Sequence, residues 1–324
     1  MSLTDNASLQ GALAGLRVID LTGVVLGPYA TQILGDYGAD VIKIEPPSGD
    51  IMRHAGPMKH PGMGHIFINA NRNKRSVVLD LKKPEQREQL LALCKTADVL
   101  TYNIRPASMA RLGLSYETLH AINPRLVVCG AYGYSEGGPY SEWPAYDDLI
   151  QGAVGMPWLM TQSGSTEPRY VPATFADRVT GLNMVHAVMA AVIARYRTDV
   201  GQHVEVPMFE CLLQFVMGEH LSGETWQPPI GPMGYARMLS TNRKPYRTRD
   251  GHICALMYNE AHWAAFLELV GQPDLFQTDA RFANHAARIQ HIDALYGFVA
   301  EHMQHRSTAE WLKVLAARDI PVMP

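Results

Sequence analysis

The sequence has few cysteines and none of the spacings that cysteine chemistry requires. Its four cysteines, at positions 94, 129, 211 and 254, are far apart and form no C-x-x-C pair. We therefore expect reduced, mostly buried thiols and neither a disulfide framework nor a zinc site. The thirteen histidines include no H-E-x-x-H, and a Walker loop is also missing. The catalytic candidates are therefore carboxylates, and no metal is expected.

An excess of charge of one sign and long apolar runs are missing as well. The formal net charge is −3 and 18% of residues are charged, which argues against nucleic-acid or membrane-surface binding as a global property. A polyanionic ligand would have to meet a local basic cluster. No run of about 18 apolar residues occurs, and no basic segment followed by an apolar one opens the chain. We predict a cytoplasmic protein without membrane contact.

The first two thirds of the chain alternate short β-branched apolar segments with helical ones. Strands are predicted at residues 16–21, 39–45, 76–81, 97–103, 126–132 and 203–208, and helices at residues 28–37, 84–95 and 115–122. Strands of this kind indicate a mostly parallel sheet with helices on both faces, hence an α/β fold. In such sheets, ligands bind beyond the carboxyl ends of the strands.

The loop after the first predicted strand contains Gly23 and Gly27, and Glu45 ends the second strand. This arrangement resembles a dinucleotide-binding loop with a ribose-binding acid. The spacing is G-x-x-x-G instead of G-x-G-x-x-G, which argues against a nicotinamide dehydrogenase. We expect these glycines to let the backbone approach a different ligand.

Residues 172–211 contain an acid, Asp177, at the start of a long apolar helix that leads into a strand. A stripe at three- and four-residue spacings is predicted to face the core: Leu182, Val185, Val188, Met189, Val192, Ile193 and Tyr196. Asp177 has two interpretations that are compatible. It is a helix cap that accepts a backbone N–H, or it is a nucleophile in a cleft, with Gly181 giving a ligand access to the backbone.

Two basic stretches lie next to predicted strands. Arg72, Lys74 and Arg75 are at the entry to the third strand, and a stretch with Asn103, Arg105 and Arg111 follows another strand. Each is either a solvated loop or a site for phosphate groups. Tyr146, Asp147 and Asp148 precede an apolar segment, so they either cap a helix or form a wall of the site.

The C-terminal part differs in composition. Residues 218–245 are rich in glycine and proline and are interpreted as a linker, a crossover or a lid. A strand-and-turn stretch follows, with helices near 260–270, 284–303 and 308–317. The last residues, DIPVMP, are apolar and extended, from which we suspect a truncated chain. The predicted domains are residues 1–220, a linker or lid at 221–245, and a small domain at 246–324.

Several segments, in order, closely resemble the class III CoA-transferases of the CaiB/BaiF family, which includes formyl-CoA and carnitine CoA-transferases and α-methylacyl-CoA racemases. They are LAGLRVIDLTGVVLGPYATQILGDYGADVIKIEPPSGD, NKRSVVLDLK, the stretch from NIRP to LGLSYETLHAINPRLV, YDDLIQGAVG, ADRVTG and RKPYRTRDGHI. The resemblance implies a large Rossmann-like domain, a smaller α+β domain and an interlocked homodimer.

The resemblance also implies a mechanism. An aspartate matching Asp177 attacks an acyl-CoA thioester, giving a mixed anhydride and then an aspartyl-CoA thioester, from which a small carboxylic acid takes the CoA. We expect donors near the start of the Asp177 helix, including backbone N–H groups of the glycine-rich lid, to stabilise the developing oxyanion. The CoA-contacting positions implied by the resemblance are Val24 and Val25 on the pantetheine path, Lys74 and Arg75 at the phosphates, Asn103 and Arg111, and Met208 near the reacting end.

The chain departs from the family pattern at Val25, Pro46 and Pro144, which replace polar or basic residues. Tyr146 replaces the histidine of the racemases, and tyrosine is a poor base near neutral pH, which makes racemisation the less favoured alternative. The family's return segment is not found after Pro324. A non-catalytic CoA-binding fragment is therefore a third hypothesis, and we expect such a form to have low stability or to associate.

Overall fold

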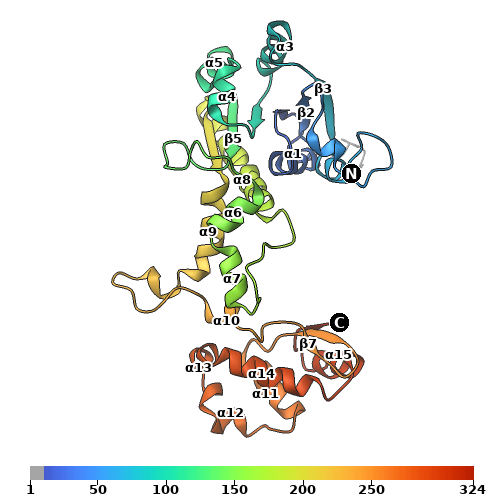
Figure 1. Ribbon diagram of the computed structural model, residues 1–324, viewed down its shortest axis with the longest axis vertical. Helices are drawn as coiled ribbons and strands as arrows, with labels where there is room; N and C mark the ends of the chain where they lie inside the picture. Colours follow the sequence, from blue (N-terminus) through green and yellow to red (C-terminus); the bar gives the residue numbers. More distant parts are fainter. Residues whose placement is uncertain (1–10) are drawn as a thin grey trace, which may run out of the picture. The chain divides into compact units, whose positions relative to one another are not determined.

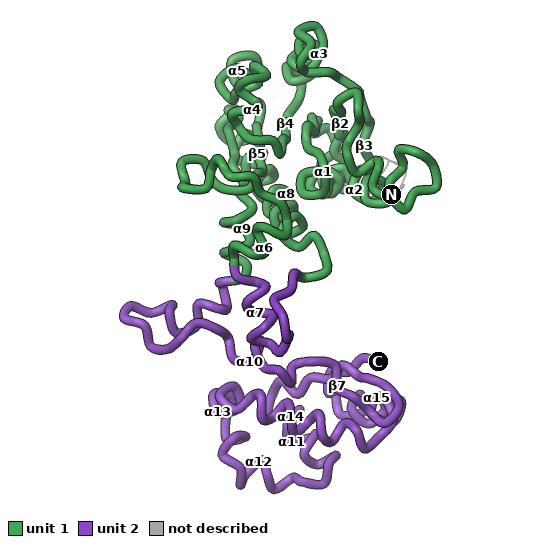
Figure 2. Tube along the Cα trace, viewed as in Figure 1, with its two compact units in different colours: residues 1–154, 171–216 green, residues 155–170, 217–324 purple. Residues whose placement is uncertain are grey.

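The computed structural model describes residues 11–324, which form two compact units (Figure 2). The first contains the residues up to Val154 and Val171–Val216, and the second contains Gly155–Tyr170 and Met217–Pro324. The short segment 155–170 thus belongs with the C-terminal part of the chain. The predicted domain boundary at residue 220 and the linker at 221–245 stay predictions.

The first unit is built on a six-stranded sheet in which every neighbouring pair is parallel. The strand order is β3-β2-β1-β4-β5-β6. The strands are β1 (Arg17–Asp20), β2 (Asp40–Glu45), β3 (Lys74–Val78), β4 (Val99–Tyr102), β5 (Val127–Tyr132) and β6 (His203–Pro207). The predicted α/β fold is confirmed, although β3 begins and ends earlier than its predicted range, 76–81. The order reverses between β1 and β4, where parallel sheets of this kind bind ligands.

Helices cover both faces of the sheet. On one face, α1 (Leu26–Asp36) and α8 (Phe175–Thr198) pack together, and α8 also packs on β5 and β6 (Figure 1). On the other face lie α3 (Pro84–Cys94), α4 (Pro106–Arg111) and α5 (Tyr116–Ile122), whose Leu90, Met109 and Leu119 join alternate strand residues in one core. The unit also contains η1 (Ile51–His54), α2 (His65–Ala70), α6 (Asp147–Ala153) and the start of α9 (Met208–His220).

By length and composition alone, helix α8 is long and apolar enough to cross a membrane. Half of its apolar 18-residue stretch is buried inside the protein, however. Its buried side includes Val179, Met184, Val188 and Ala191. The predicted stripe was wrong in part, because Leu182, Ile193 and Tyr196 are exposed. The buried and the exposed apolar residues of α8 both recur at helical spacing. Periodicity alone therefore did not distinguish the face toward the sheet from the opposite face.

Gly181 has a packing role in this helix. A Cβ at this position would lie 2.8 Å from the carbonyl oxygen of Leu26 and 3.0 Å from the ring of Tyr29. The predicted role of Gly181 in ligand access is therefore corrected: its missing side chain lets α8 approach the backbone of α1. Gly27 is similar, because its Cβ would collide with the side chain of Thr22.

The second unit has a three-stranded sheet with only antiparallel pairs, ordered β7-β8-β9. Its strands are β7 (Tyr246–Arg247), β8 (His252–Ala255) and β9 (Val322–Met323). The extended end of the sequence thus forms an edge strand. The core joins Trp263, Phe266 and Trp311 to aliphatic residues of the same unit. Its helices are α7 (Met156–Gln162), η2 (Ser222–Thr225), α10 (Ala236–Leu239), α11 (Glu260–Leu269), α12 (Leu275–Thr278), η3 (Ala280–Phe282), α13 (His285–Gln290), α14 (Ile292–Met303) and α15 (Thr308–Ala316).

Candidate active site

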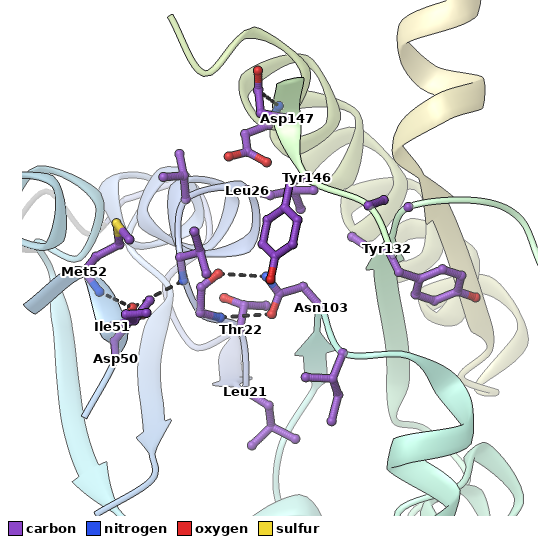
Figure 3. Close-up of a pocket in the computed structure, with 18 of the residues that line it drawn as sticks. Leu21, Thr22, Leu26, Asp50, Ile51, Met52, Asn103, Tyr132, Tyr146 and Asp147 are labelled. Carbon is purple, nitrogen blue, oxygen red and sulfur yellow. Dashed lines mark hydrogen bonds between the residues drawn. The ribbon is translucent and has the colours of Figure 1, made fainter. Parts of the chain in front are cut away.

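A cavity of about 860 Å³ lies in the first unit, at the carboxyl ends of the parallel strands. Its walls come from the loops after β1, β2, β4 and β5 and from the starts of α6, α8 and α9, and Figure 3 shows part of this lining. The volume falls within the range of small-molecule and cofactor sites, about 300–1,000 Å³. The loops after β1 and β4, on either side of the reversal in strand order, both contribute. The sequence correctly indicated this edge of the sheet.

Asp177 lines the cavity from the first turn of α8. Its backbone N–H donates to Oδ2 of Asp147 at 2.9 Å, while the residue that precedes the helix, Thr174, makes no side-chain cap. The capping interpretation is therefore corrected, because Asp147 from α6 caps this helix and Asp177 is the residue that is capped. Within residues 11–324, no hydrogen bond to the carboxylate oxygens of Asp177 is found. The guanidinium of the neighbouring Arg178 stacks over the ring of Tyr29, with 4.3 Å between its Cζ atom and the ring centroid.

The surroundings of Asp177 disfavour its charged form. Burial raises the pKa of its carboxyl to about 7, the charge of Asp147 acts in the same direction, and Arg178 opposes both. A carboxylate in this position is poorly solvated. No ion pair from the described residues neutralises it, so its oxygens are available to an electrophile.

Asp147 is itself held by Gln151, which is completely buried. The side-chain amide of Gln151 donates to Oδ1 of Asp147 at 2.6 Å and to the carbonyl of Ala173 at 3.3 Å. Its oxygen accepts the N–H of Val171 at 2.9 Å. These bonds tie α6 to the segment that leads into α8. Together, Asp147 and Gln151 fix where the helix of Asp177 begins.

The loop after β1 is held in an unusual conformation. Val24 has φ of 70°, which is rare for a β-branched residue. Its N–H donates to Asp50 at 3.3 Å, and Asp50 pairs with the buried ammonium of Lys43 at 3.0 Å. Asn103 accepts the N–H of Gly23 at 2.9 Å and donates to its carbonyl at 2.7 Å. Side chains from β2, the loop after it and the end of β4 therefore hold this wall of the cavity in place.

Five of the eight predicted site residues line the cavity together: Val24, Val25, Asn103, Asp177 and Met208. The other three do not line it. Lys74 is 2% exposed and donates to Asp20, to the carbonyl of Pro28 and to Asn71, so its ammonium is already satisfied. Arg75 is exposed and pairs with Asp40, and Arg111 donates to Ser108. Their role at the CoA phosphates stays a prediction.

Other lining residues also bear on the predictions. Arg105 lines the cavity, and one of its Nη atoms donates to the carbonyl of Glu142 at 3.0 Å. Glu45 lines it too, but Arg53 holds its carboxylate at 2.6 Å, so it does not act as a free ribose-binding acid. Burial opposes ionisation of Glu45, yet the hydrogen bonds from Arg53 and Ser76 lower its pKa to about 2.

Sequence reasoning missed the supporting roles of Asp50 and Gln151. Neither lies in a pattern that differs from an ordinary loop or helix, and their partners are distant in sequence. In the part of the chain that the structure describes, no group of three or more histidine, cysteine or acidic side chains is placed to hold a metal ion.

Comparison with known proteins identifies the family. The model of CoA-transferase family III matches residues 13–324. The chain belongs to CoA-transferase family III. The predicted enzyme class, CoA-transferase, is thereby confirmed. The chain is 34% identical to the acetyl-CoA:oxalate CoA-transferase of Acetobacter aceti, covering 100% of this chain and 83% of the relative. It is 33% identical to the succinate–glutarate CoA-transferase of Agrobacterium fabrum, covering 89% of this chain and 74% of the relative.

Solved structures of this family have the same fold. A CAIB/BAIF family protein from Brucella suis superposes with a TM-score of 0.80 at 33% identity, covering 97% of this chain and 84% of that one. Rv3272 from Mycobacterium tuberculosis gives a TM-score of 0.83 at 29% identity, with the same coverage of both chains. These similarities confirm the Rossmann-like family fold predicted from the sequence.

Proposed function

We propose that this CoA-transferase family III protein moves CoA from an acyl-CoA to a small carboxylic acid, with Asp177 as the nucleophile. The supporting observation is the state of this side chain: it faces the cavity at the sheet's carboxyl edge, has no hydrogen-bond partner within residues 11–324, and has a pKa raised to about 7. Its neighbours thus orient the acid without pairing with it. The family relatives named above, which are transferases between acids, support the same reaction class.

In the first half of the reaction, a carboxylate oxygen of Asp177 bonds to the thioester carbonyl carbon and the C–S bond breaks. This gives a mixed anhydride and a CoA thiolate. The thiolate then attacks the aspartyl carbonyl carbon, releases the donor acid and leaves an aspartyl-CoA thioester. In the second half, the carboxylate of the acceptor acid attacks the aspartyl-CoA thioester, which gives a new mixed anhydride and a CoA thiolate. The thiolate then attacks the acceptor's carbonyl carbon, forms the new acyl-CoA and releases the carboxylate of Asp177. No net proton, electron or water is consumed, so a poorly hydrated cavity is an advantage.

Orientation is the main contribution that the described residues make to this proposal. A carboxylate is a weak nucleophile in water, and correct placement contributes up to roughly 7–11 kcal/mol. Asp147 and Gln151 fix the start of α8, and the constrained loop at Val24 and Val25 forms the facing wall. We expect the pantetheine arm along that wall and Met208 near the thioester. The identity of the oxyanion donors stays a prediction.

The decisive experiment is to trap the intermediate. The protein is mixed with an acyl-CoA, such as acetyl-CoA or succinyl-CoA, and quenched with hydroxylamine or borohydride, and the adduct is mapped by mass spectrometry. Modification at Asp177 supports the proposal. If no adduct forms while CoA binds, the covalent mechanism fails. Exchange of the α-proton with deuterated solvent would then indicate the racemase alternative, and absence of exchange would indicate a non-catalytic CoA-binding protein.

We further propose that the protein acts in the cytoplasm as a homodimer. The exposed face of α8, with Leu182, Ile193 and Tyr196, is an apolar surface suited to a second copy of this chain. Sedimentation at several protein concentrations tests the dimer. A monomer at all concentrations would contradict it.

A further inference from the structure

A second, smaller cavity of about 50 Å³ lies entirely within the second unit. Its basic lining residues are Arg237, Arg288 and His285, and none of its lining residues is an acid. The remaining lining consists of tyrosines and apolar side chains: Tyr235, Tyr258, Tyr296, Met257, Trp263, Ile289 and Ile292. Such a combination of cations and apolar walls without an acid favours an anion that has an apolar end.

Arg288 is the most informative residue of this cavity. Its side chain is 3% exposed, and within the described residues its Nε has no hydrogen-bond partner. One Nη donates to the carbonyl of Phe282 at 2.8 Å. The other reaches Glu260 at 3.4 Å, and Glu260 is 69% exposed, so that acid compensates the charge only weakly. A buried guanidinium with an unused donor is costly unless another anion approaches it.

Arg237, which lies in α10, faces the same cavity. Its Nε donates to the hydroxyl of Tyr296 at 3.0 Å, which fixes the plane of the guanidinium. Within residues 11–324, neither of its Nη groups makes a hydrogen bond. Two guanidinium groups with unused donors therefore line one small space. Planar forks of this kind match the two oxygens of a carboxylate.

The size of the cavity limits the ligand. A volume of about 10–15 Å³ holds one water, so this cavity has room for about three to five non-hydrogen atoms. The upper end of this range is a carboxylate with its α-carbon and one further carbon. Trp263 and Ile292 supply an apolar wall for such a carbon, whereas a phosphate ester would leave its oxygens against them.

We propose that this cavity binds the carboxylate of a short aliphatic acid, with Arg237 and Arg288 as its ligands. The site shares no lining residue with the cavity of Asp177 and does not rest on the proposed transfer reaction. Its residues belong to the second unit only.

The test is calorimetric titration of the full chain with sodium propionate, with sodium chloride keeping the ionic strength constant. We expect a saturable site that depends on Arg237, with a dissociation constant on the order of 1 mM. Asp177→Ala, which alters only the other cavity, should bind propionate at this site with the affinity of the wild type. Arg237→Gln should bind at least about tenfold more weakly, and Arg237→Lys should fall between them, because it keeps the charge and loses the fork.

A second pair of variants tests the cavity without changing its charge. Ile289→Phe should fill the space and abolish binding, and its control Ile289→Leu should retain it. Circular dichroism and the thermal midpoint check each fold, and the Ile289 pair decides the question if Arg237→Gln does not fold. The proposal would be overturned if Arg237→Gln and Ile289→Phe both bound propionate with the affinity of the wild type. It would also be overturned if the wild type showed no saturable binding of propionate. Equal binding of phosphate would overturn its carboxylate class.

Discussion

Two aspartates near the same edge of the sheet have opposite surroundings. Asp20, at the end of β1, is fully buried, and it accepts hydrogen bonds from Thr22, Thr31 and Lys74. Burial alone would raise its pKa, but the charges of Lys74 and Lys43 and the bonds from the threonines hold that pKa well below its usual value. Asp177 is partly buried, has no such partners in the part of the chain that the structure describes, and has a pKa raised to about 7.

The difference shows that burial alone does not decide what an acid does. Asp20 is held as a permanent anion that keeps the ammonium of Lys74 in place below the first loop. Asp177 is held by its backbone, through Asp147, and its carboxylate oxygens have no hydrogen-bond or ion-pair partner within residues 11–324. The same residue type is a structural charge in one place and a reactive group in the other. The predictions below test this contrast, beginning with the largest effect.

Replacement of the unpaired acid should remove activity and leave the fold intact. For Asp177→Ala we expect the rate of CoA transfer to fall by at least about 10³-fold, because the nucleophile is lost. CoA binding should be nearly unchanged. The measurement is the steady-state transfer rate together with CoA affinity by calorimetry. Wild-type turnover in the variant would refute the assignment of the nucleophile.

Replacement of the paired acid should instead affect stability. For Asp20→Asn we expect a loss of about 3–5 kcal/mol in the free energy of unfolding, because the buried ammonium of Lys74 loses its counter-charge. Urea denaturation measures it. Asp40→Asn is the matched control, since Asp40 pairs with the exposed Arg75 and should cost only about 0–1 kcal/mol. If the two variants lost equal amounts of unfolding free energy, the assignment of Asp20 as a buried structural charge would be contradicted.

The raised pKa of Asp177 has a consequence for stability. Its folded-state pKa of about 7 lies above the usual aspartate pKa of 3.8, so ionisation disfavours the folded state. The wild type should therefore lose stability as the pH rises from about 4 to 7. Asp177→Asn should not show this loss, and it should be more stable by up to a few kcal/mol above pH 7. Urea denaturation at pH 4.5 and at pH 8 tests this, and a difference that does not grow with pH would contradict the raised pKa.

The smallest expected effect concerns Asp147, a positioning residue for Asp177. The value of kcat/KM should rise with pH through the pKa of about 7, because only the ionised carboxylate attacks. Asp147→Asn keeps an oxygen for the N–H of Asp177 and removes the repelling charge, so the pH midpoint should move to a lower pH. A purely structural role would lower the rate at every pH without moving the midpoint. The pH–rate profiles of wild type and variant distinguish the two.

The sequence by itself determined the strands, the parallel sheet and the edge at which the cavity lies. Apolar β-branched runs and glycine turns act over a few residues, so their signal is local. The acid at the start of the long helix and the family resemblance placed Asp177 at the candidate site. Five of the eight predicted site residues line one cavity, because each follows a strand or begins a helix at the same edge.

Only the tertiary structure decided how each charged group is paired. Lys74 lies in a basic run that suits phosphates, yet the fold places Asp20, distant in sequence, beside its ammonium. Asp147 caps the helix of Asp177 across a loop, and Gly181 packs against α1. Pairing energies depend on which groups meet and on how much water they lose, and both are set by contacts between distant segments. The sequence therefore indicated the edge of the sheet where the cavity lies, and the three-dimensional contacts determined that the carboxylate of Asp177 has no side-chain partner among residues 11–324.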